Sequence, residues 1–197
     1  MTSCHPDIPD FMLDDIELPD GPSRPTGPRF ENLTPQQRLP GRHLAMIHGH
    51  FRGNMQVLRD LLGKAEAGEL TAGELMAEAE AMPMMENYRR FGALCGQHCQ
   101  IIEMHHSIED QAIFPELSGK SAAFKAVVDQ LIAEHEVVHA FLVKLVGELS
   151  ALIENPSPEQ FASAREVYEA LEKLLLSHFR YEETEIGDAL GYYGIGV

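Results

Sequence analysis

Apolar residues recur every three or four positions along four long stretches of this chain, a spacing that places them on one face of an α-helix. The stretches cover about residues 34–62, 83–115, 121–153 and 157–186, and none of them alternates apolar and polar residues as a β-strand does. Four amphipathic helices joined by short connections can bury their apolar faces against one another. The sequence therefore predicts an all-α fold, an antiparallel up-down four-helix bundle.

The N-terminal part of the chain differs in composition from these stretches. Residues 1–35 hold seven of the twelve prolines and no sustained apolar period, which predicts an irregular, acidic, Pro-rich tail. The bundle is expected over residues 36–190, followed by a short C-terminal tail over residues 191–197. Capping-box patterns that begin at Thr34 and Ser157 predict the starts of the first and last helices.

The charge of the chain argues against two classes of partner. Thirty-one acidic and fifteen basic residues give a formal net charge of −16, which repels nucleic-acid phosphates and anionic lipid. The apolar runs are too short to span a bilayer, and the N-terminus lacks the basic and apolar regions of a secretory signal. Three cysteines form no disulfide framework. We therefore expect a cytoplasmic protein that binds neither nucleic acid nor membrane.

Five of the ten histidines fall on the apolar faces of the predicted helices. They are His48, His105, His135, His139 and His178. A single buried histidine is usually a hydrogen-bonded core residue, but here each of the four predicted helices carries at least one. Each ring has two nitrogens that need partners in a region otherwise made of Leu, Ile and Val. A bound metal would satisfy these nitrogens together.

Two glutamates complete a set of candidate metal ligands. Glu109 and Glu182 each follow a histidine by four residues, so that a carboxylate stacks over an imidazole on the same helix face. His135 and His139 have the same spacing. Five imidazoles and two carboxylates exceed the ligands of one tetrahedral zinc ion, but they suit two metal ions that share carboxylates. The mixed nitrogen and oxygen donors favour two iron ions, with manganese or zinc as secondary choices.

Four segments occur in order on the successive predicted helices: IHGHFR, HHSIEDQAIFP, EHEVVH and HFRYEE. Together they resemble the hemerythrin-like family, the hemerythrin His-His-Glu cation-binding domain, over roughly residues 37–190. The resemblance implies an antiparallel four-helix bundle around an oxo- or hydroxo-bridged, non-haem di-iron centre. Carried over position by position, the implied metal ligands are His48, His105, Glu109, His135, His139, His178 and Glu182.

Three further residues stay open as ligands. Hemerythrins place the acid of the last helix five residues after its histidine, which here is Glu183, although Glu182 lies closer to the face of His178. Some relatives use the residue that follows the second-helix histidine, here His106. Helix periodicity places His106 about 100° from the apolar stripe, which favours a supporting or surface role. Tyr181 is near enough in sequence to hydrogen-bond or ligate.

The resemblance implies a protein that binds O2 or a related small oxidant, peroxide or NO, inside the bundle. Family members bind or sense oxygen, sense iron, or decompose peroxide or nitric oxide. An enzyme is therefore the main alternative: a di-iron oxidoreductase with catalase-like, NO-reducing or organic-substrate oxidase activity. An oxygen or iron sensor and a structural zinc site are further alternatives, and the sequence identifies no protein partner.

Overall fold

The computed structural model describes residues 23–67, 94–154 and 157–197, apart from the side chains of residues 61, 62, 64–66, 94–100 and 153. The elements are α1 (Leu39–Glu66), α3 (Leu94–Ile108), the π-helix η4 (Glu109–Ile113), α4 (Phe114–Ser118), α5 (Ala122–Glu154) and α6 (Pro158–Tyr193). No residue in the described ranges forms a β-strand, which agrees with the predicted all-α class. None of the helices in those ranges is long and apolar enough to cross a bilayer.

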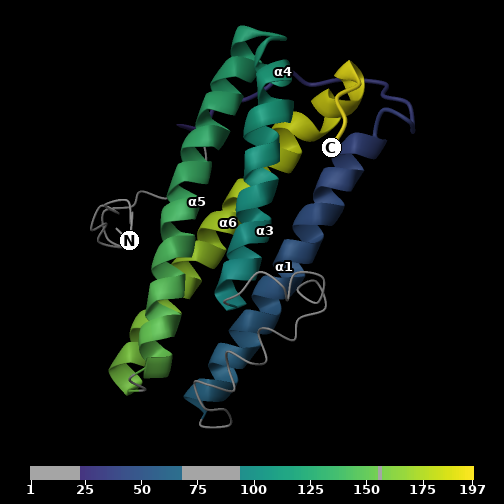
Figure 1. Cartoon of the computed structure of the whole chain (residues 1–197). Helices are drawn as coiled ribbons and strands as arrows, with labels where there is room; N and C mark the ends of the chain where they lie inside the picture. Colours follow the sequence, from purple (N-terminus) through teal and green to yellow (C-terminus); the bar gives the residue numbers. More distant parts are fainter. Residues whose placement is uncertain (1–22, 68–93, 155–156) are drawn as a thin grey trace.

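The long helices α1, α3, α5 and α6 lie side by side as a helical bundle (Figure 1). Helix α6 packs against both α1 and α5, and α3 packs against α5. Between α1 and α6 the paired positions run in opposite order, because Gly41 approaches Gly187 whereas Arg59 bonds to Glu172. These contacts bring residues from distant parts of the sequence to the same level of the bundle.

The buried apolar side chains form two clusters, and a layer of polar residues lies at the boundary between them. On α1, for example, Leu44 belongs to one cluster and Phe51 to the other, with the buried His48 between them. Each long helix contributes a buried histidine at this boundary: His48 from α1, His105 from α3, His135 from α5 and His178 from α6. The bundle therefore places a polar site in the middle of its core.

The predicted capping box at Thr34 forms, but the α-helix starts later than predicted. The amide of Gln37 donates to Thr34 Oγ1 (3.2 Å), and the amide of Thr34 donates to Gln37 Oε1 (3.0 Å). Residues 35–38 form a turn, and α1 begins at Leu39. Pro40 has no amide hydrogen to donate to the carbonyl four residues earlier, so the regular hydrogen-bond ladder is established only after it.

Helix α6 takes in part of the expected C-terminal tail. Its start agrees with the prediction, because Ser157 Oγ accepts a hydrogen bond from the Gln160 amide (3.1 Å). It ends at Tyr193, and Gly194 follows in the left-handed conformation with a φ of 70°. Gly191 does not end the helix; a Cβ there would overlap the carbonyl oxygen of Gln37. This glycine serves the close packing of α6 against the chain that enters α1.

The second predicted helical stretch is interrupted by a π-helix and extends beyond its predicted end. Residues 83–93 of that stretch lie outside the described residues. From α3 the chain continues through η4 into α4, so the helical path passes Pro115 and ends at Ser118. Pro115 lies in the first turn of α4, where a missing amide hydrogen costs little. Single π-turns of this kind are frequent at functional sites.

The described part of the predicted N-terminal tail packs on the bundle. Residues 24–30, the N-terminal segment, bond to side chains of α5 and α6. Arg24 pairs with Glu134 of α5 (3.0 Å), and the Gly27 amide donates to Glu185 of α6 (2.8 Å). Residues 1–22 lie outside the described residues. The compositional boundary at residue 35 therefore does not separate this segment from the bundle.

Candidate metal centre

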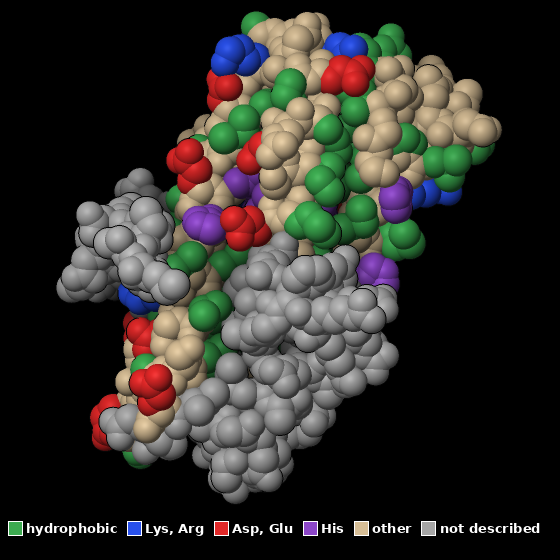
Figure 2. Space-filling view, viewed as in Figure 1, with side chains coloured by type: hydrophobic (Ala, Val, Ile, Leu, Met, Phe, Trp, Pro, Cys, Tyr) green, Lys and Arg blue, Asp and Glu red, His purple; other side chains and the backbone are tan. Residues whose placement is uncertain are grey.

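Seven buried side chains from α1, α3, η4, α5 and α6 form two groups of candidate metal ligands. The first group is His48, His105, Glu109 and Glu182, and the second is His106, His135 and His178. In each group, one potential ligand atom of every member lies within 4.8 Å of the others. Little of this layer reaches the surface. On the face shown in Figure 2, histidine side chains appear in a few places among hydrophobic and acidic ones.

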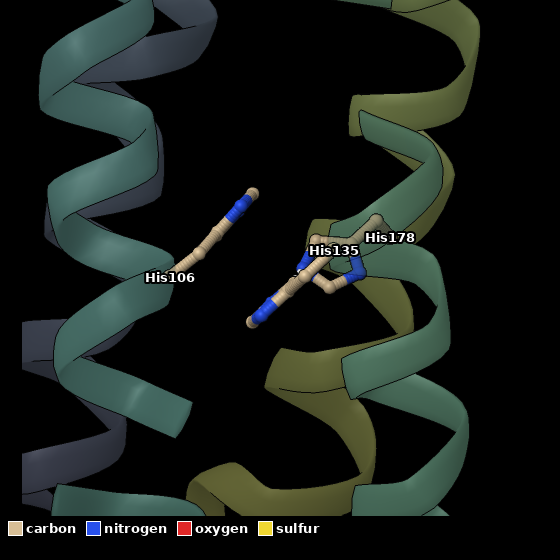
Figure 3. Close-up of side chains that lie close together, drawn as sticks. All are labelled: His106, His135 and His178. Carbon is tan, nitrogen blue, oxygen red and sulfur yellow. Dashed lines mark hydrogen bonds between the residues drawn. The ribbon is translucent and has the colours of Figure 1, made fainter. Parts of the chain in front are cut away.

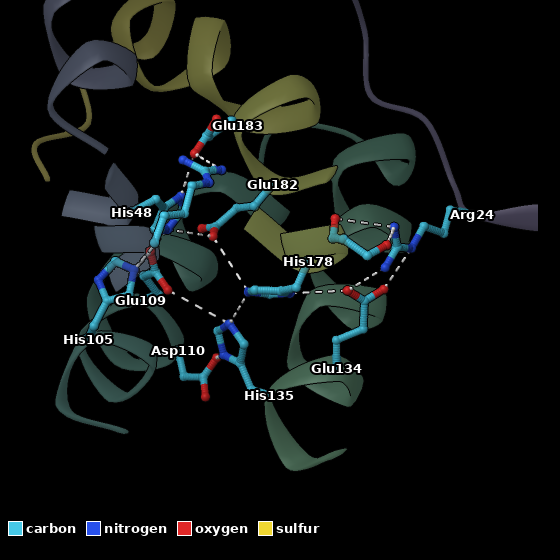
Figure 4. A network of polar contacts seen from close by, with 12 residues as sticks. Arg24, His48, His105, Glu109, Asp110, Glu134, His135, His178, Glu182 and Glu183 are labelled. Atoms are coloured by element: carbon cyan, nitrogen blue, oxygen red, sulfur yellow. Dashed lines mark hydrogen bonds and ion pairs between the residues drawn. The ribbon is translucent and has the colours of Figure 1, made fainter. Parts of the chain in front are cut away.

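In the first group, ring nitrogens from α1 and α3 meet carboxylate oxygens from η4 and α6 (Figure 4). His48 Nε2 lies 3.0 Å from His105 Nε2 and 3.3 Å from Glu182 Oε2. His105 Nε2 lies 3.2 Å from Glu109 Oε1. Two imidazole nitrogens and two carboxylates thus converge on one point in the core.

In the second group, imidazoles from three helices come together (Figure 3). His135 Nε2 lies 3.2 Å from His178 Nε2. The ring of His106 reaches over from α3 and stacks on that of His135, with centroids 3.8 Å apart and an angle of 7° between the planes. The same ring lies edge-on to His178, at 5.4 Å between centroids. The second group is therefore richer in nitrogen than the first.

The two glutamates of the first group lie between its histidines and those of the second group. Glu109 Oε1 is near His105 of the first group, and its Oε2 lies 3.7 Å from His135 Nε2 of the second. Glu182 Oε2 is near His48 and also lies 3.6 Å from His178 Nε2. Each carboxylate can therefore interact with nitrogens of both groups.

Three of the site histidines bond to a carboxylate through the nitrogen that points away from the centre (Figure 4). The pairs are His48 Nδ1 with Glu183 (2.9 Å), His135 Nδ1 with Asp110 (3.0 Å) and His178 Nδ1 with Glu134 (3.1 Å). A neutral imidazole that donates its Nδ1 hydrogen to a carboxylate has a lone pair at Nε2. The inward Nε2 atoms are then suited to bind a metal, and carboxylates at the outer nitrogen are typical of metal-binding histidines.

The spacing of these atoms and their lack of partners fit a bound metal. Two nitrogens held at right angles, each about 2.1 Å from one ion, lie about 3.0 Å apart. The two Nε2 pairs are separated by 3.0 and 3.2 Å. Among the described residues, the buried side-chain atoms without a hydrogen bond are His106 Nε2 and both carboxylate oxygens of Glu109 and Glu182. Each such atom costs about 1–3 kcal/mol when it is left unsatisfied, and a metal would satisfy all five.

Burial and neighbouring charges raise the pKa of some candidate ligands and lower the pKa of others. Burial lowers the pKa of His105 to about 3 and holds the pKa of His106 well below its usual value, so both rings are neutral at neutral pH. Burial also opposes a charge on His48, but the neighbouring carboxylates of Glu182 and Glu183 outweigh it and raise the pKa. Burial and the neighbouring Glu182 raise the pKa of Glu109 well above its usual value. For Glu182 burial acts in the same direction, but the surrounding histidines outweigh it and lower the pKa.

The structure brings together six of the seven residues predicted as ligands and places His139 elsewhere. The side chain of His139 is 53% exposed, and its Nδ1 lies 3.7 Å from Glu103 Oε1. The expectation that His139 faces the core is wrong, because it directly follows the buried Val138 on α5 and so points about 100° away from it. His106, for which a supporting or surface role was expected, is buried in the second group instead.

The other open positions are also placed by the structure. Glu182 is fully buried between the histidines of the two groups, whereas Glu183 bonds to the outer nitrogen of His48 and to Arg52 (2.8 Å). The hydroxyl of Tyr181 donates to the carbonyl oxygen of Pro25 (2.7 Å), on the side of the N-terminal segment. Of the two adjacent acids of α6, Glu182 is thus the one that faces the candidate centre.

A helical bundle in which imidazoles and carboxylates from all its long helices meet in the core defines a cation-binding bundle protein. The family model of the hemerythrin HHE cation binding domain matches residues 39–190, and the protein belongs to that family. The match confirms the resemblance carried by the four histidine-containing segments and runs from the first residue of α1 to the last turn of α6. Comparisons with curated proteins and with solved structures give no match.

Proposed function

We propose that this protein is a non-haem di-iron protein that binds O2 or a related small oxidant, peroxide or NO, in the centre of the bundle. The observation that carries the proposal is the position of Glu109 and Glu182, whose carboxylates lie between two groups of histidine nitrogens. Carboxylates from facing helices bridge two metal ions in bundles of this kind. A single ion would leave one group of nitrogens without a partner.

In this proposal each group of histidines would hold one ion, and Glu109 and Glu182 would offer carboxylate oxygens to both ions. His48 and His105 belong to one ion, and His106, His135 and His178 belong to the other. Mixed imidazole and carboxylate donors suit iron, with manganese as the alternative. A four-coordinate zinc ion would use only part of this set.

An ion held by His48 and His105 would have fewer histidine ligands than the other, which would leave room for a small molecule. Two phenyl rings lie beside these histidines: Phe179 stacks on His48 with centroids 4.2 Å apart, and Phe51 lies 5.3 Å from the ring of His105. These apolar rings exclude water from that side of the centre and favour a small, weakly polar ligand. When bound, the iron pair would supply the electrons that hold or reduce such a ligand.

The surrounding protein would hold the ligands in one orientation. Glu183, Asp110 and Glu134 each fix the tautomer of one histidine by accepting its Nδ1 hydrogen.

The opposite order of contacts between α1 and α6, and the short connection between α5 and α6, support an up-down antiparallel bundle. An easily oxidised ferrous centre and three cysteines suit the reducing cytoplasm, where we expect the protein to act.

Elemental analysis after anaerobic loading of the metal-free protein with ferrous iron tests this proposal. We expect two iron ions per chain for the unaltered protein. His135→Ala should lower the iron content sharply, because it removes an imidazole of the second group. His50→Ala, at an exposed position of α1, is the control and should load normally. Normal iron content in His135→Ala would contradict the proposal.

Exposure of the loaded protein to air separates a carrier from an enzyme. A visible absorption band that appears in air and disappears under vacuum would support reversible O2 binding. Oxygen evolution from added peroxide over many turnovers would identify a catalase-like enzyme instead. Zinc in the purified protein, with neither response after loading, would identify a structural site and refute the proposal.

A further inference from the structure

Arg24 precedes the matched family domain, yet it contacts the partner of a histidine in the candidate centre (Figure 4). Its Nε and Nη2 donate to Oε1 and Oε2 of Glu134, both at 3.0 Å. Glu134 Oε2 in turn lies 3.1 Å from His178 Nδ1. We infer that Arg24 is a positioning residue of the metal centre, which fixes Glu134 and through it the tautomer and orientation of His178. The inference rests on the proposed metal site.

The guanidinium of Arg24 is held in place by more than its pair with Glu134. Its Nη1 donates to Ser177 Oγ (3.0 Å), and its central carbon lies 4.6 Å from the centroid of the Tyr181 ring. The Tyr181 hydroxyl donates to the carbonyl oxygen of Pro25, the next residue of the same segment (2.7 Å). The Arg24 side chain is only 9% exposed. A buried bidentate pair of this kind is more rigid than an exposed ion pair.

Glu134 depends on Arg24 for half of its hydrogen bonds. Oε1 accepts from Arg24 and from Gln130 Nε2 (2.8 Å), and Oε2 accepts from Arg24 and lies next to His178. The carboxylate is 2% exposed. Without the guanidinium, the buried carboxylate of Glu134 would lose its only cationic neighbour among these contacts. It would also lose the two hydrogen bonds that fix the orientation of the carboxylate plane. The direction in which His178 presents Nε2 would then be less defined.

The other two outer carboxylates are supported differently. Glu183, which bonds to His48, receives a hydrogen bond from Arg52 of α1, inside the matched domain. Asp110, which bonds to His135, is 33% exposed. Glu134 is the most buried of the three, and its arginine comes from the N-terminal segment. This chain thus adds a residue from outside the family domain to the surroundings of its candidate centre.

Cobalt(II) binding by the metal-free, full-length protein tests this role, with affinity measured by competition against a chelator. Arg24→Met keeps an apolar stem and removes the guanidinium. We expect it to weaken cobalt binding at least about tenfold, the range for loss of a residue that supports a metal-binding histidine. Arg29→Met is the matched control on the same segment. Arg29 is 58% exposed and bonds to Glu185 and the Thr184 carbonyl, so its loss disturbs docking alone.

A double substitution shows whether Arg24 acts through Glu134. In Glu134→Gln the acceptor has lost its charge, so adding Arg24→Met should cost little further affinity. A full tenfold loss in that background, or an equal effect of Arg24→Met and Arg29→Met in the unaltered background, would overturn the inference. If Arg24→Met does not fold by circular dichroism, Arg24→Lys compared with Arg29→Lys takes its place, because lysine keeps the charge and loses the two-pronged contact.

Nitrogen-15 NMR of the histidine rings separates this inference from the proposed function. In the metal-free protein, Arg24→Met should change the His178 Nδ1–H signal or its exchange with water, and Arg29→Met should not. Unchanged His178 signals in Arg24→Met would refute the role of Arg24 whatever the site binds. If the unaltered protein bound no divalent metal, the proposed function would fail, and these ring signals would still decide the role of Arg24.

Discussion

Replacing His106 should weaken metal binding far more than replacing His139. His106 is buried in the second ligand group with an unpaired Nε2, whereas His139 is exposed beside Glu103. We expect His106→Ala to lose at least about tenfold in cobalt affinity or one bound ion per chain, and His139→Ala to bind like the unaltered protein. Calorimetric titration of both variants measures this. Loss of metal from His139→Ala alone would show that the exposed ring is the ligand.

Acid should destabilise the metal-free protein in part through His105. The pKa of His105 is about 3 in the folded chain and 6.5 in the unfolded chain. Between pH 3 and pH 6.5 the unfolded chain therefore binds a proton at this ring that the folded chain does not. The folded state is therefore favoured above pH 6.5 and loses stability as the pH falls towards 3, by up to about 1.4 kcal/mol per pH unit.

Urea unfolding of the metal-free protein at several pH values between 7 and 4 measures this effect. His105→Leu should flatten the pH dependence of the unfolding free energy, because it removes the group that gains a proton on unfolding. His50→Leu, an exposed substitution on α1, controls for the loss of a histidine elsewhere. Equal slopes for His105→Leu and the unaltered protein would show that His105 does not titrate in this way.

The sequence could not show that both of two adjacent histidines, His105 and His106, are candidate metal ligands. Spacing of four residues placed His105 with Glu109 and His178 with Glu182, because one helix face carries both members. It could not show that α3 has partners on two sides. His105 meets His48 of α1, and His106, about 100° further round, meets His135 of α5. Two adjacent histidines can therefore both be buried, a possibility that a single apolar stripe does not reveal.

At the level of helices, the contact between α1 and α6 depends on glycine. A Cβ on Gly41 would lie 2.5 Å from the carbonyl oxygen of Gly187, closer than packing allows. Gly41→Ala should therefore force the helices apart and lower the free energy of unfolding by about 1–3 kcal/mol. Gly53→Ala is the control: it lies on the same helix, is exposed, and a Cβ there meets nothing within 4 Å.

The control should change stability in the opposite direction. Alanine favours the helix over glycine by up to about 1 kcal/mol, so Gly53→Ala should stabilise the protein slightly. Denaturant unfolding of the two metal-free variants gives both values. A Gly41→Ala variant as stable as Gly53→Ala would mean that the two helices are further apart than the structure places them.

The helices themselves were largely predictable, and the exceptions have local causes. Apolar period and the Ser157 cap located α5 and the start of α6 within a residue or two. The π-helix η4 was not predicted, because its residues Glu109–Ile113 have no composition that distinguishes them from an α-turn. It lies where Glu109 faces the ligand groups and Asp110 bonds to His135. The two consecutive acids, Glu109 and Asp110, are the feature of the sequence that could have drawn attention to this turn.

For the molecule as a whole, metal binding should add substantially to thermal stability. All four long helices contribute candidate ligands, so an ion that binds only the folded state would link them. At a thousandfold excess over the dissociation constant, binding contributes about 4 kcal/mol. In a chain of this size the melting temperature would rise on the order of 10 °C. Calorimetric scans with and without cobalt measure the shift, which His135→Ala should reduce; an equal shift in that variant would point to binding elsewhere.

The all-α class of the molecule followed from periodicity, but the outline of the domain did not. Composition separated residues 1–35 from the bundle, because proline-rich, aperiodic sequence has no helical face. Tertiary contacts override that boundary: Gly27 bonds to Glu185, and Phe30 stacks on Tyr192 with centroids 4.2 Å apart. Such contacts join positions more than 150 residues apart in sequence, and no local pattern encodes them.

The salt bridge between Arg24 and Glu134 also determines where an expressed version of this protein has to begin. A fragment cut at the borders of the family domain would lose only the last three residues of α6 among the described long helices, yet it would leave one carboxylate of the core without its counter-ion. Recombinant versions, and chimeras that exchange this bundle with that of a relative, should therefore begin upstream of the first helix. Where a homologue lacks a basic residue there, its carboxylate at the corresponding place has to be neutralised from another direction.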